Sequence, residues 1–156
     1  MAIEKVIEYF RELGAEDKIK QFDVSSATVE LAAEALGCEG ARIAKTMSFL
    51  VDDHAVLIVT AGDMKIDNSK FKAQFHSKAK MLTAEQLDEL VGHAPGGVCP
   101  FAVKKGCVTY LDESLKRFEI VYPAAGNAAS AVELTVSELE KYSLSLGWVD
   151  VCKAKN

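Results

Sequence analysis

Apolar residues recur at helical spacing in three stretches of the chain. Residues 2–13 carry them at positions 3, 6, 7, 10 and 13, and Gly14 follows as a residue typical of helix C-termini. Residues 29–36 form a similar stretch between Thr28, a good N-cap residue, and Gly37. Residues 68–75 place two phenylalanines four positions apart, on one helical face. The pattern predicts three helices.

Two capping boxes predict further helix starts. Thr83 is followed three residues later by Gln86, and Thr135 by Glu138, so that each pair can satisfy two unbonded backbone N–H groups reciprocally. Apolar residues at helical spacing follow each box, and Gly92 follows the first as a stop. We therefore expect a helix after each box.

Apolar, β-branched runs predict the strands. Residues 46–51 and 54–60 are two such runs separated by two aspartates, a spacing that indicates an antiparallel hairpin. Shorter runs predict strands at residues 19–24, 102–103, 107–111, 118–122 and 148–151. Strands outnumber helices and the hairpin requires antiparallel pairing, so we expect an α+β fold with a mixed, strongly curved sheet flanked by helices. The strand order does not follow from the pattern.

The length and composition are those of a small globular protein. A chain of 156 residues has the size of one domain, and we expect residues 1–156 to form one. The N-terminus lacks the basic region and the uninterrupted apolar run of a signal peptide, and the apolar run at residues 55–61 is too short to cross a bilayer. We therefore expect a cytoplasmic protein that does not associate with membranes.

Cysteines and histidines are scattered, at Cys38, Cys99, Cys107, Cys152, His54, His76 and His93. No two cysteines have the two-residue gap of zinc sites or redox dithiols, and no two histidines have the spacing of a metal-binding helix face. We expect reduced thiols, no metal and no cofactor.

The formal net charge of −5 argues against nucleic acid as a partner, but the charge is unevenly distributed. Residues 42–117 carry eleven Lys and Arg against nine Asp and Glu, and the rest of the chain carries seven against fourteen. The lysines of residues 65–80 are compatible with a local basic face or with an ordinary solvated surface.

Standard catalytic motifs are absent: the chain has no Gly-x-Ser-x-Gly elbow, no Walker loop and no Gly-x-Gly-x-x-Gly turn. Lys45 stands just before an apolar strand, so its stem should lie near the core while its ammonium needs water, a carboxylate or an anionic ligand. A structural role and a role as a fixed positive charge on a phosphate both fit this position.

Two loops are candidate binding elements. In Gly96-Gly97-Val98-Cys99-Pro100 the glycines allow close backbone approach and backbone N–H groups could stabilise an oxyanion, although the same composition is typical of turns. Cys99 has no predicted activating partner and is interpreted as a bystander. Residues 123–130, which include Gly126, carry small side chains that suit a pocket wall or a plain connection. Asn127 and Ser130 in this loop are possible ligand-bonding groups.

Several short motifs, in this order, resemble the YbaK/ProX family of aminoacyl-tRNA deacylases, whose domain also occurs as the editing insertion of bacterial prolyl-tRNA synthetases. They are residues 29–37 leading to Ala44-Lys45-Thr46, Ala61-Gly62-Asp63 with Asp67, the Gly-x-x-x-Pro loop of residues 96–100, and Tyr122-Pro123-Ala124-Ala125-Gly126-Asn127 before residues 132–135. The likeness spans nearly the whole chain.

The resemblance implies a barrel-like α+β fold that hydrolyses the ester between a wrong amino acid and the 3′ end of tRNA, without a metal. Lys45 resembles the family's essential lysine, and Gly96 and Pro100 resemble the loop that positions the reacting carbonyl. The remaining expected substrate-binding residues are Gly97, Val98, Cys99, Gly126, Asn127 and Ser130. Mischarged tRNA is the expected partner, and recruitment by an aminoacyl-tRNA synthetase stays open.

Departures from the commoner family pattern leave the substrate open. Cys99 in the first loop and residues 126–130 in the second do not identify the amino acid, and Cys- or Ala-tRNA(Pro) are examples of fitting substrates. A non-catalytic module of the same fold that binds tRNA, a small ligand or a synthetase is the alternative. A thiol-dependent enzyme is a third interpretation.

Overall fold

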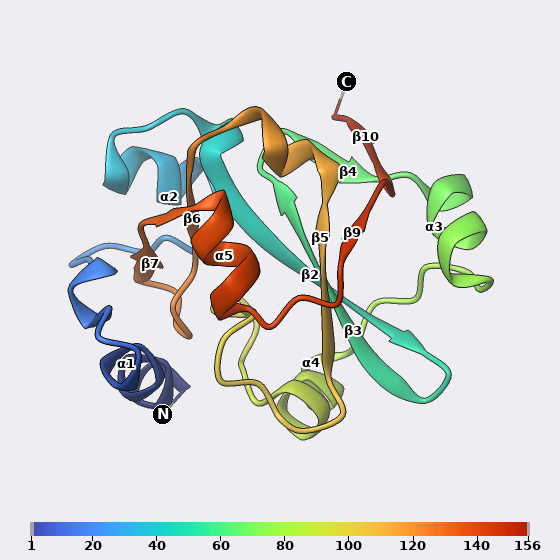
Figure 1. The fold of residues 1–156 in the computed structure, drawn as a ribbon, viewed down its shortest axis with the longest axis horizontal. Helices are drawn as coiled ribbons and strands as arrows, with labels where there is room; N and C mark the ends of the chain where they lie inside the picture. Colours follow the sequence, from blue (N-terminus) through green and yellow to red (C-terminus); the bar gives the residue numbers. More distant parts are fainter. Residues whose placement is uncertain (1, 156) are drawn as a thin grey trace.

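A six-stranded mixed sheet with the order β8-β6-β2-β3-β5-β9 forms the centre of the computed structural model, which describes residues 2–155 (Figure 1). Two-stranded pairings of β1 with β7 and of β10 with β4 flank it. The strands are β1 (Ile19–Gln21), β2 (Ile43–Val51), β3 (His54–Ala61), β4 (Met64–Ile66), β5 (Val108–Asp112), β6 (Ile120–Pro123), β7 (Ser130–Val132), β8 (Leu134–Thr135), β9 (Trp148–Val149) and β10 (Cys152–Ala154).

The helices are α1 (Ala2–Glu12), α2 (Val29–Leu36), α3 (Asn68–Phe75), α4 (Ala84–Gln86), which continues as a π-helical turn over Leu87–Val91, and α5 (Val136–Tyr142). Short 3₁₀ turns lie at Glu16–Lys18, Gly40–Arg42 and Glu113–Arg117. No helix among residues 2–155 is long and apolar enough to span a bilayer.

The α+β class, the mixed sheet and the predicted helices are confirmed. Thr28 caps α2 by accepting from the Leu31 N–H, and Gly37 ends it in the left-handed conformation at φ 69°. Both capping boxes are formed, at Thr83 and at Thr135. These elements follow from local sequence because their stabilising contacts join residues at most four positions apart.

The predicted hairpin is also confirmed. β2 and β3 pair from Ala44 opposite Ala61 to Val51 opposite His54, and the two aspartates of the turn take positive φ values of 49° and 67°. The sequence suggested that Lys45 lies just ahead of this strand. In the structure β2 begins at Ile43, so Lys45 lies inside it.

One predicted strand is wrong and two are too long. Residues 102–103 form a loop in which Ala102 takes φ 53°, a left-handed conformation that no strand accepts. The predicted strands at 19–24 and 148–151 end at Gln21 and Val149. The pattern also missed β4, β7 and β10, three-residue strands that exist only because distant segments pair with them.

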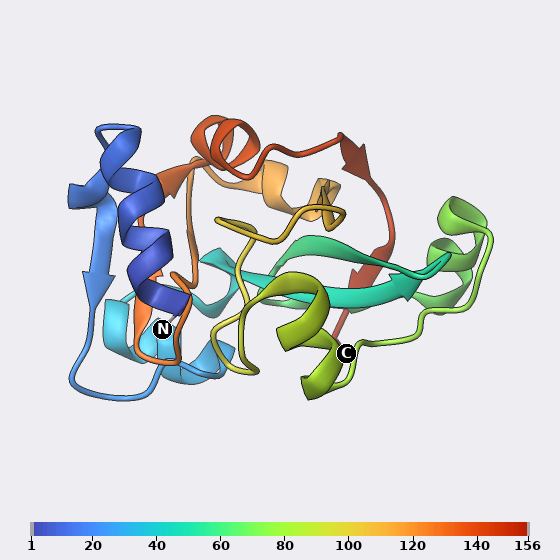
Figure 2. The same ribbon diagram turned by 90° about the horizontal axis from the view of Figure 1, so that it is seen from below.

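Apolar clusters pack on both faces of the sheet. Ala44, Val59 and Ala61 face a cluster shared with α1 and α5, in which Phe10 and Phe101 pack edge to face at 4.8 Å. The opposite face packs against α3, where the rings of Phe49 and Phe71 lie 4.7 Å apart. Consequently α3 lies beside the tip of the β2–β3 hairpin and α1 lies at the other end of the molecule (Figure 2).

Asp112, at the end of β5, connects the sheet to the C-terminal segment. Its side chain is 1% exposed, and its two carboxylate oxygens accept from the backbone N–H groups of Ser114 and Val151, each at 2.9 Å. The carboxylate thus fixes both the turn after β5 and the link between β9 and β10.

We expect Asp112→Ala to lower the free energy of unfolding by about 3 kcal/mol, because two buried N–H groups lose a charged acceptor. Asp150→Ala removes the same charge from an exposed pair with Lys70 and should cost under about 1 kcal/mol. Urea denaturation of both variants measures the difference, and equal losses would contradict the assignment.

Candidate functional site

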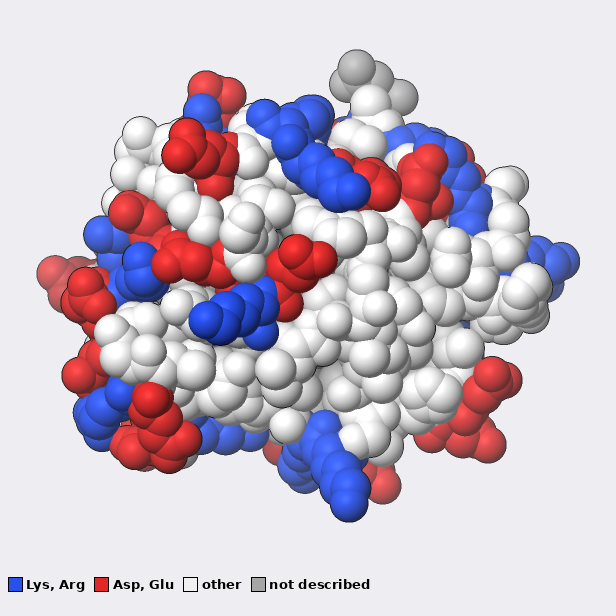
Figure 3. Space-filling model, viewed as in Figure 1, with Lys and Arg blue, Asp and Glu red and all other residues white. Residues whose placement is uncertain are grey.

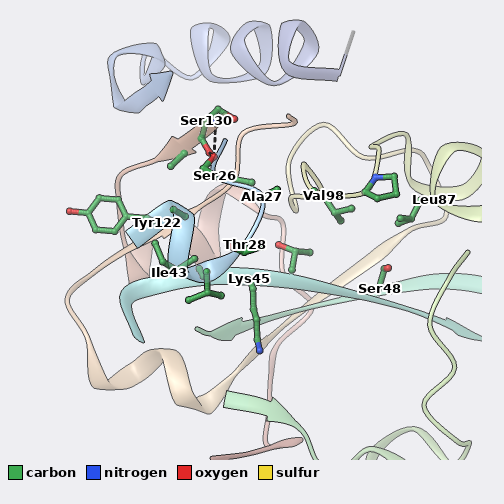
Figure 4. A pocket seen from close by; sticks show the side chains of 18 of the residues that line it. Ser26, Ala27, Thr28, Ile43, Lys45, Ser48, Leu87, Val98, Tyr122 and Ser130 are labelled. Carbon is green, nitrogen blue, oxygen red and sulfur yellow. Dashed lines mark hydrogen bonds between the residues drawn. The ribbon is translucent and has the colours of Figure 1, made fainter. Parts of the chain in front are cut away.

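A pocket of about 420 Å³ lies along the outer edge of β2 (Figure 4). Its walls come from residues 26–28 and the first turn of α2, from β2 itself, from Met81 and Leu82, from the 95–98 loop, and from β6 and β7. The lining is mostly alanine, serine, threonine and aliphatic side chains, with Lys45 and Tyr122 as its titratable groups. A volume of this size is ordinary for a small-ligand site.

The outer edge of β2 is paired at both ends but not in the middle. Ile43 and Ala44 pair with β6, while the carbonyl of Ser48 and the N–H of Leu50 bond to Leu82 and Lys80. Backbone groups alternate along a strand, so those of Thr46 point toward the same outer edge. No strand occupies that position within residues 2–155, and the pocket lies there.

Polar groups of β2 line this gap. The hydroxyl of Thr46 is buried and has no hydrogen-bond partner among the described residues. Ser48, on the same face of the strand, is buried and points to the side of Val98 and Leu87 (Figure 4). A buried hydroxyl without a partner is costly, so this wall is suited to bonding a polar ligand. Sequence reasoning missed both residues.

Lys45 contributes to the wall, but its ammonium lies on the other side of β2. Figure 4 shows the side chain leaving the strand away from Ser26 and Ser130, and Nζ donates to the carbonyl of Met64. Partial burial lowers the pKa of this lysine, and the positive charge of Lys155 lowers it further. A single neutral carbonyl is a weak partner for an ammonium, and an anion would be a stronger one.

The 96–100 loop lies only partly in the pocket. Gly96 and Val98 line it, whereas Gly97 packs against the 123–130 loop. A Cβ placed on Gly97 would lie 2.5 Å from the Cα of Asn127, so only glycine allows the two loops to meet. Pro100 is buried and borders a separate hollow with Tyr9. The loop therefore reaches the pocket through its first half.

Cys99 is inaccessible within this loop. Its side chain is fully buried, with Sγ 3.8 Å from the carbonyl of Phe101, and burial raises the pKa of the thiol to about 12. His93 Nε2 lies 3.5 Å from Sγ, but the same nitrogen lies 2.8 Å from the Phe101 carbonyl and so donates its proton there. The histidine is not placed to activate the thiol.

The 123–130 loop uses its polar groups to hold its own shape. Ser130 lines the pocket, yet its Oγ accepts from the Ala125 N–H at 3.2 Å and donates to the Asn127 carbonyl. Ser26 Oγ accepts from the Ser130 N–H at 3.1 Å. Asn127 Oδ1 accepts from the Ala129 N–H, and Gly126, at φ 104°, packs against the start of α1. Of these expected binding residues, only Ser130 lines the pocket.

No group of His, Cys, Asp and Glu side chains within residues 2–155 is arranged to hold a metal ion.

Comparison with known proteins identifies the family. The family model described as the aminoacyl-tRNA editing domain matches residues 23–142, a range that includes all of the pocket lining. The chain belongs to the aminoacyl-tRNA editing domain family. The family resemblance noted from the sequence is therefore confirmed, and the pocket lies within the editing domain.

The relatives of this editing domain include a whole protein, part of a synthetase and a solved structure. YwhH of Bacillus subtilis (strain 168), an uncharacterized protein, is 47% identical over 154 residues, 98% of each chain. The proline–tRNA ligase of that organism is 26% identical over 99 residues, which are 63% of this chain and 16% of the ligase. A protein provisionally described as a trans-editing enzyme for prolyl tRNA synthetase has a crystal structure with a TM-score of 0.88, 26% identity and 98% coverage of each chain.

We expect Thr46→Val to leave the free energy of unfolding unchanged or to raise it by up to about 1 kcal/mol, because it removes a buried hydroxyl that has no partner. Thr60→Val is the matched control, since Thr60 is fully buried and donates to the Ala61 carbonyl, and it should cost about 1 kcal/mol. Thermal denaturation compares the two, and an equal loss in both would show that the fold uses the Thr46 hydroxyl.

Alkylation of the native protein should spare Cys99. A pKa of about 12 leaves roughly 1,000-fold less thiolate than the ordinary value of 9.0, and burial blocks access as well. We expect Cys99 to react at least about 100-fold more slowly than the partly exposed Cys38 at pH 8, as measured by peptide mass spectrometry. In urea the two should react alike, and rapid native labelling of Cys99 would reopen the thiol-enzyme interpretation.

Proposed function

We propose that the protein is a free-standing editing hydrolase that releases the amino acid from mischarged tRNA. The observation that carries the proposal is the pocket at the open edge of β2, built within the editing domain from the Gly96 loop and from Lys45 and its strand. The tRNA 3′ end would enter along this edge, and the ester would lie between the edge and the loop. Such a substrate places the protein in the cytoplasm.

The proposed hydrolysis depends on positioning and electrostatics. No carboxylate or imidazole lines the pocket within residues 2–155, so the protein offers no general base there. Water would attack the ester carbonyl, and collapse of the tetrahedral intermediate would break the bond between the carbonyl carbon and the ribose oxygen. The proton lost by the water would be relayed through the substrate's own amino or ribose group to the departing ribose oxygen. The N–H of Gly97 bonds to the Ala94 carbonyl, whereas that of Val98 has no partner among the described residues and is the loop's candidate oxyanion donor.

Lys45 is proposed to bind a phosphate of the tRNA 3′ end. Its ammonium donates to one carbonyl, and a phosphate would give it a charge-assisted partner. Its role would be a fixed positive charge that holds the substrate and not a source of protons.

The small residues of the pocket favour a small amino acid, as in Cys- or Ala-tRNA(Pro). A steric pocket separates substrates that differ by one methylene by only about 1–3 kcal/mol, so activity on several small amino acids is expected. A synthetase that produces the mischarged tRNA is a second proposed partner, because the ester must reach this site before it enters translation.

A non-catalytic binding module is the second candidate. The pocket lining within residues 2–155 contains no carboxylate or imidazole, which favours it, as does the position of the Lys45 ammonium beside Met64. Such a module would bind the tRNA 3′ end or a synthetase without releasing the amino acid.

Incubation with a panel of mischarged tRNAs distinguishes the two candidates. We expect release of at least one small amino acid, a loss of roughly 100-fold in kcat/KM for Lys45→Ala, and a smaller loss for Lys45→Arg, which keeps the charge. Gly97→Ala should also reduce activity, because it forces the two loops apart. Lys105→Ala, at an exposed position outside the pocket lining, is the control.

Release from no member of the panel above the Lys45→Ala background, together with measurable binding of tRNA, would favour the binding module over the hydrolase.

A further inference from the structure

Residues 65–80, from β4 to the middle of the segment between α3 and α4, form a basic region in an acidic protein. Residues 65–80 carry five lysines and one acidic residue, Asp67, against a net charge of −5 for the chain. Asp67 is already engaged, since its carboxylate caps α3 by accepting from the N–H groups of Ser69 and Lys70. In Figure 3, Lys and Arg atoms lie over β10 and beside α3, with Asp and Glu atoms among them near β10.

Within residues 2–155, four of these five lysines form no ion pair, and Lys65 is one of the four. Lys72, Lys78 and Lys80 are exposed, and none forms an ion pair within residues 2–155, whereas Lys70 pairs with Asp150 at 3.0 Å. Lys72 and Lys78 line one hollow of about 390 Å³, together with Asn68 and Ser69. The hollow thus combines unpaired positive charges with short polar side chains. Groups of both kinds donate hydrogen bonds to phosphate oxygens.

A second pair of lysines extends the basic region. In the antiparallel pairing of β4 with β10, Lys65 lies directly opposite Lys153. Like charges at opposed positions destabilise a strand pair, and an anion placed over them would relieve the repulsion.

The basic region is continuous with the proposed active site. Residues 76–83 run from α3 toward α4 (Figure 2), and they pair with β2 where the Lys80 carbonyl accepts from Leu50 and the Leu82 N–H donates to Ser48. The next residue after Lys80 is Met81, which lines the pocket and is 55% exposed. Met81 and Lys78 are three positions apart, and three residues of extended chain span ~10 Å. This length corresponds to about three base pairs of duplex rise.

We propose that Lys72, Lys78 and Lys80 bind the phosphate backbone of the acceptor stem of the tRNA whose 3′ end enters the pocket. The inference rests on the proposed function and adds the surface that holds the body of the substrate. These lysines touch no base edge in this arrangement, so they supply affinity and orientation and not sequence preference. The acidic remainder of the protein repels the same polyanion and limits its approach to this side.

The test compares two triple variants that change the net charge equally. Lys72, Lys78 and Lys80 are replaced by alanine in one, and Lys104, Lys105 and Lys141 in the other; the control residues are exposed and line neither the pocket nor the hollow. Each variant is assayed on a full-length mischarged tRNA and on the same amino acid esterified to a CCA trinucleotide, which lacks the stem.

For the first variant we expect at least a tenfold loss of kcat/KM on tRNA, mainly through KM, and less than a twofold change on the trinucleotide. The slope of log KM against log salt should become shallower by about 2–3, at roughly 0.9 per duplex phosphate contact. The control variant should lose less than threefold. Equal losses on both substrates, equal losses in both variants, or no loss at all would overturn the proposal.

Binding of uncharged tRNA, measured by fluorescence anisotropy, separates this proposal from the proposed hydrolysis. If the wild-type protein releases no amino acid but the first variant binds tRNA at least tenfold more weakly than the control, the hydrolase proposal fails and the acceptor-stem surface stands. If the two variants bind tRNA equally well, the acceptor-stem surface is wrong whatever the activity.

Discussion

The antiparallel pairing of β2 with β3 is the interaction on which the rest of the structure depends. It runs from Ala44 to Val51 of β2 and over the whole of β3, while β3 pairs with β5 on its other side and β5 pairs with β9. Alternate residues of the two strands pack in the apolar clusters on opposite faces of the sheet, so a slip of one residue would exchange the faces and disrupt the packing on both. The same register turns Thr46 and Ser48 toward the pocket and the Lys45 ammonium toward β4. Packing and site geometry are therefore set by one constraint.

Sequence patterns predicted the elements whose determinants are local. The hairpin, α1, α2 and both capping boxes depend on residues a few positions apart, and all of them form. The short strands were missed for the opposite reason: β1 pairs with β7, and β4 with β10, across separations of more than eighty residues. Residues 102–103 form a loop and not the predicted strand because Ala102 takes a left-handed conformation, and no pattern in the neighbouring sequence indicates that.

The residues of the candidate site could be predicted from the sequence to a similar extent. Family motifs pointed to Lys45, to the 96–100 loop and to the 123–130 loop, and Lys45, Gly96, Val98 and Ser130 all line one pocket. What the motifs did not indicate is the unpaired stretch of β2, which arises because residues 80–82 and β6 cover the two ends of the strand from distant parts of the chain. Nor does a motif reveal that Ser130 and Asn127 are occupied with their own loop, since that depends on three-dimensional contacts.

The short unpaired stretch of β2 also bears on how the protein avoids self-association. An exposed strand edge can pair with an edge of another molecule and begin aggregation, and proteins usually cover or charge such edges. Here the open stretch lies between two paired ones and inside a pocket, so another strand cannot lie alongside it while a narrow, flexible ligand can. The fold can thus keep backbone donors and acceptors available for recognition without offering a template for polymerisation.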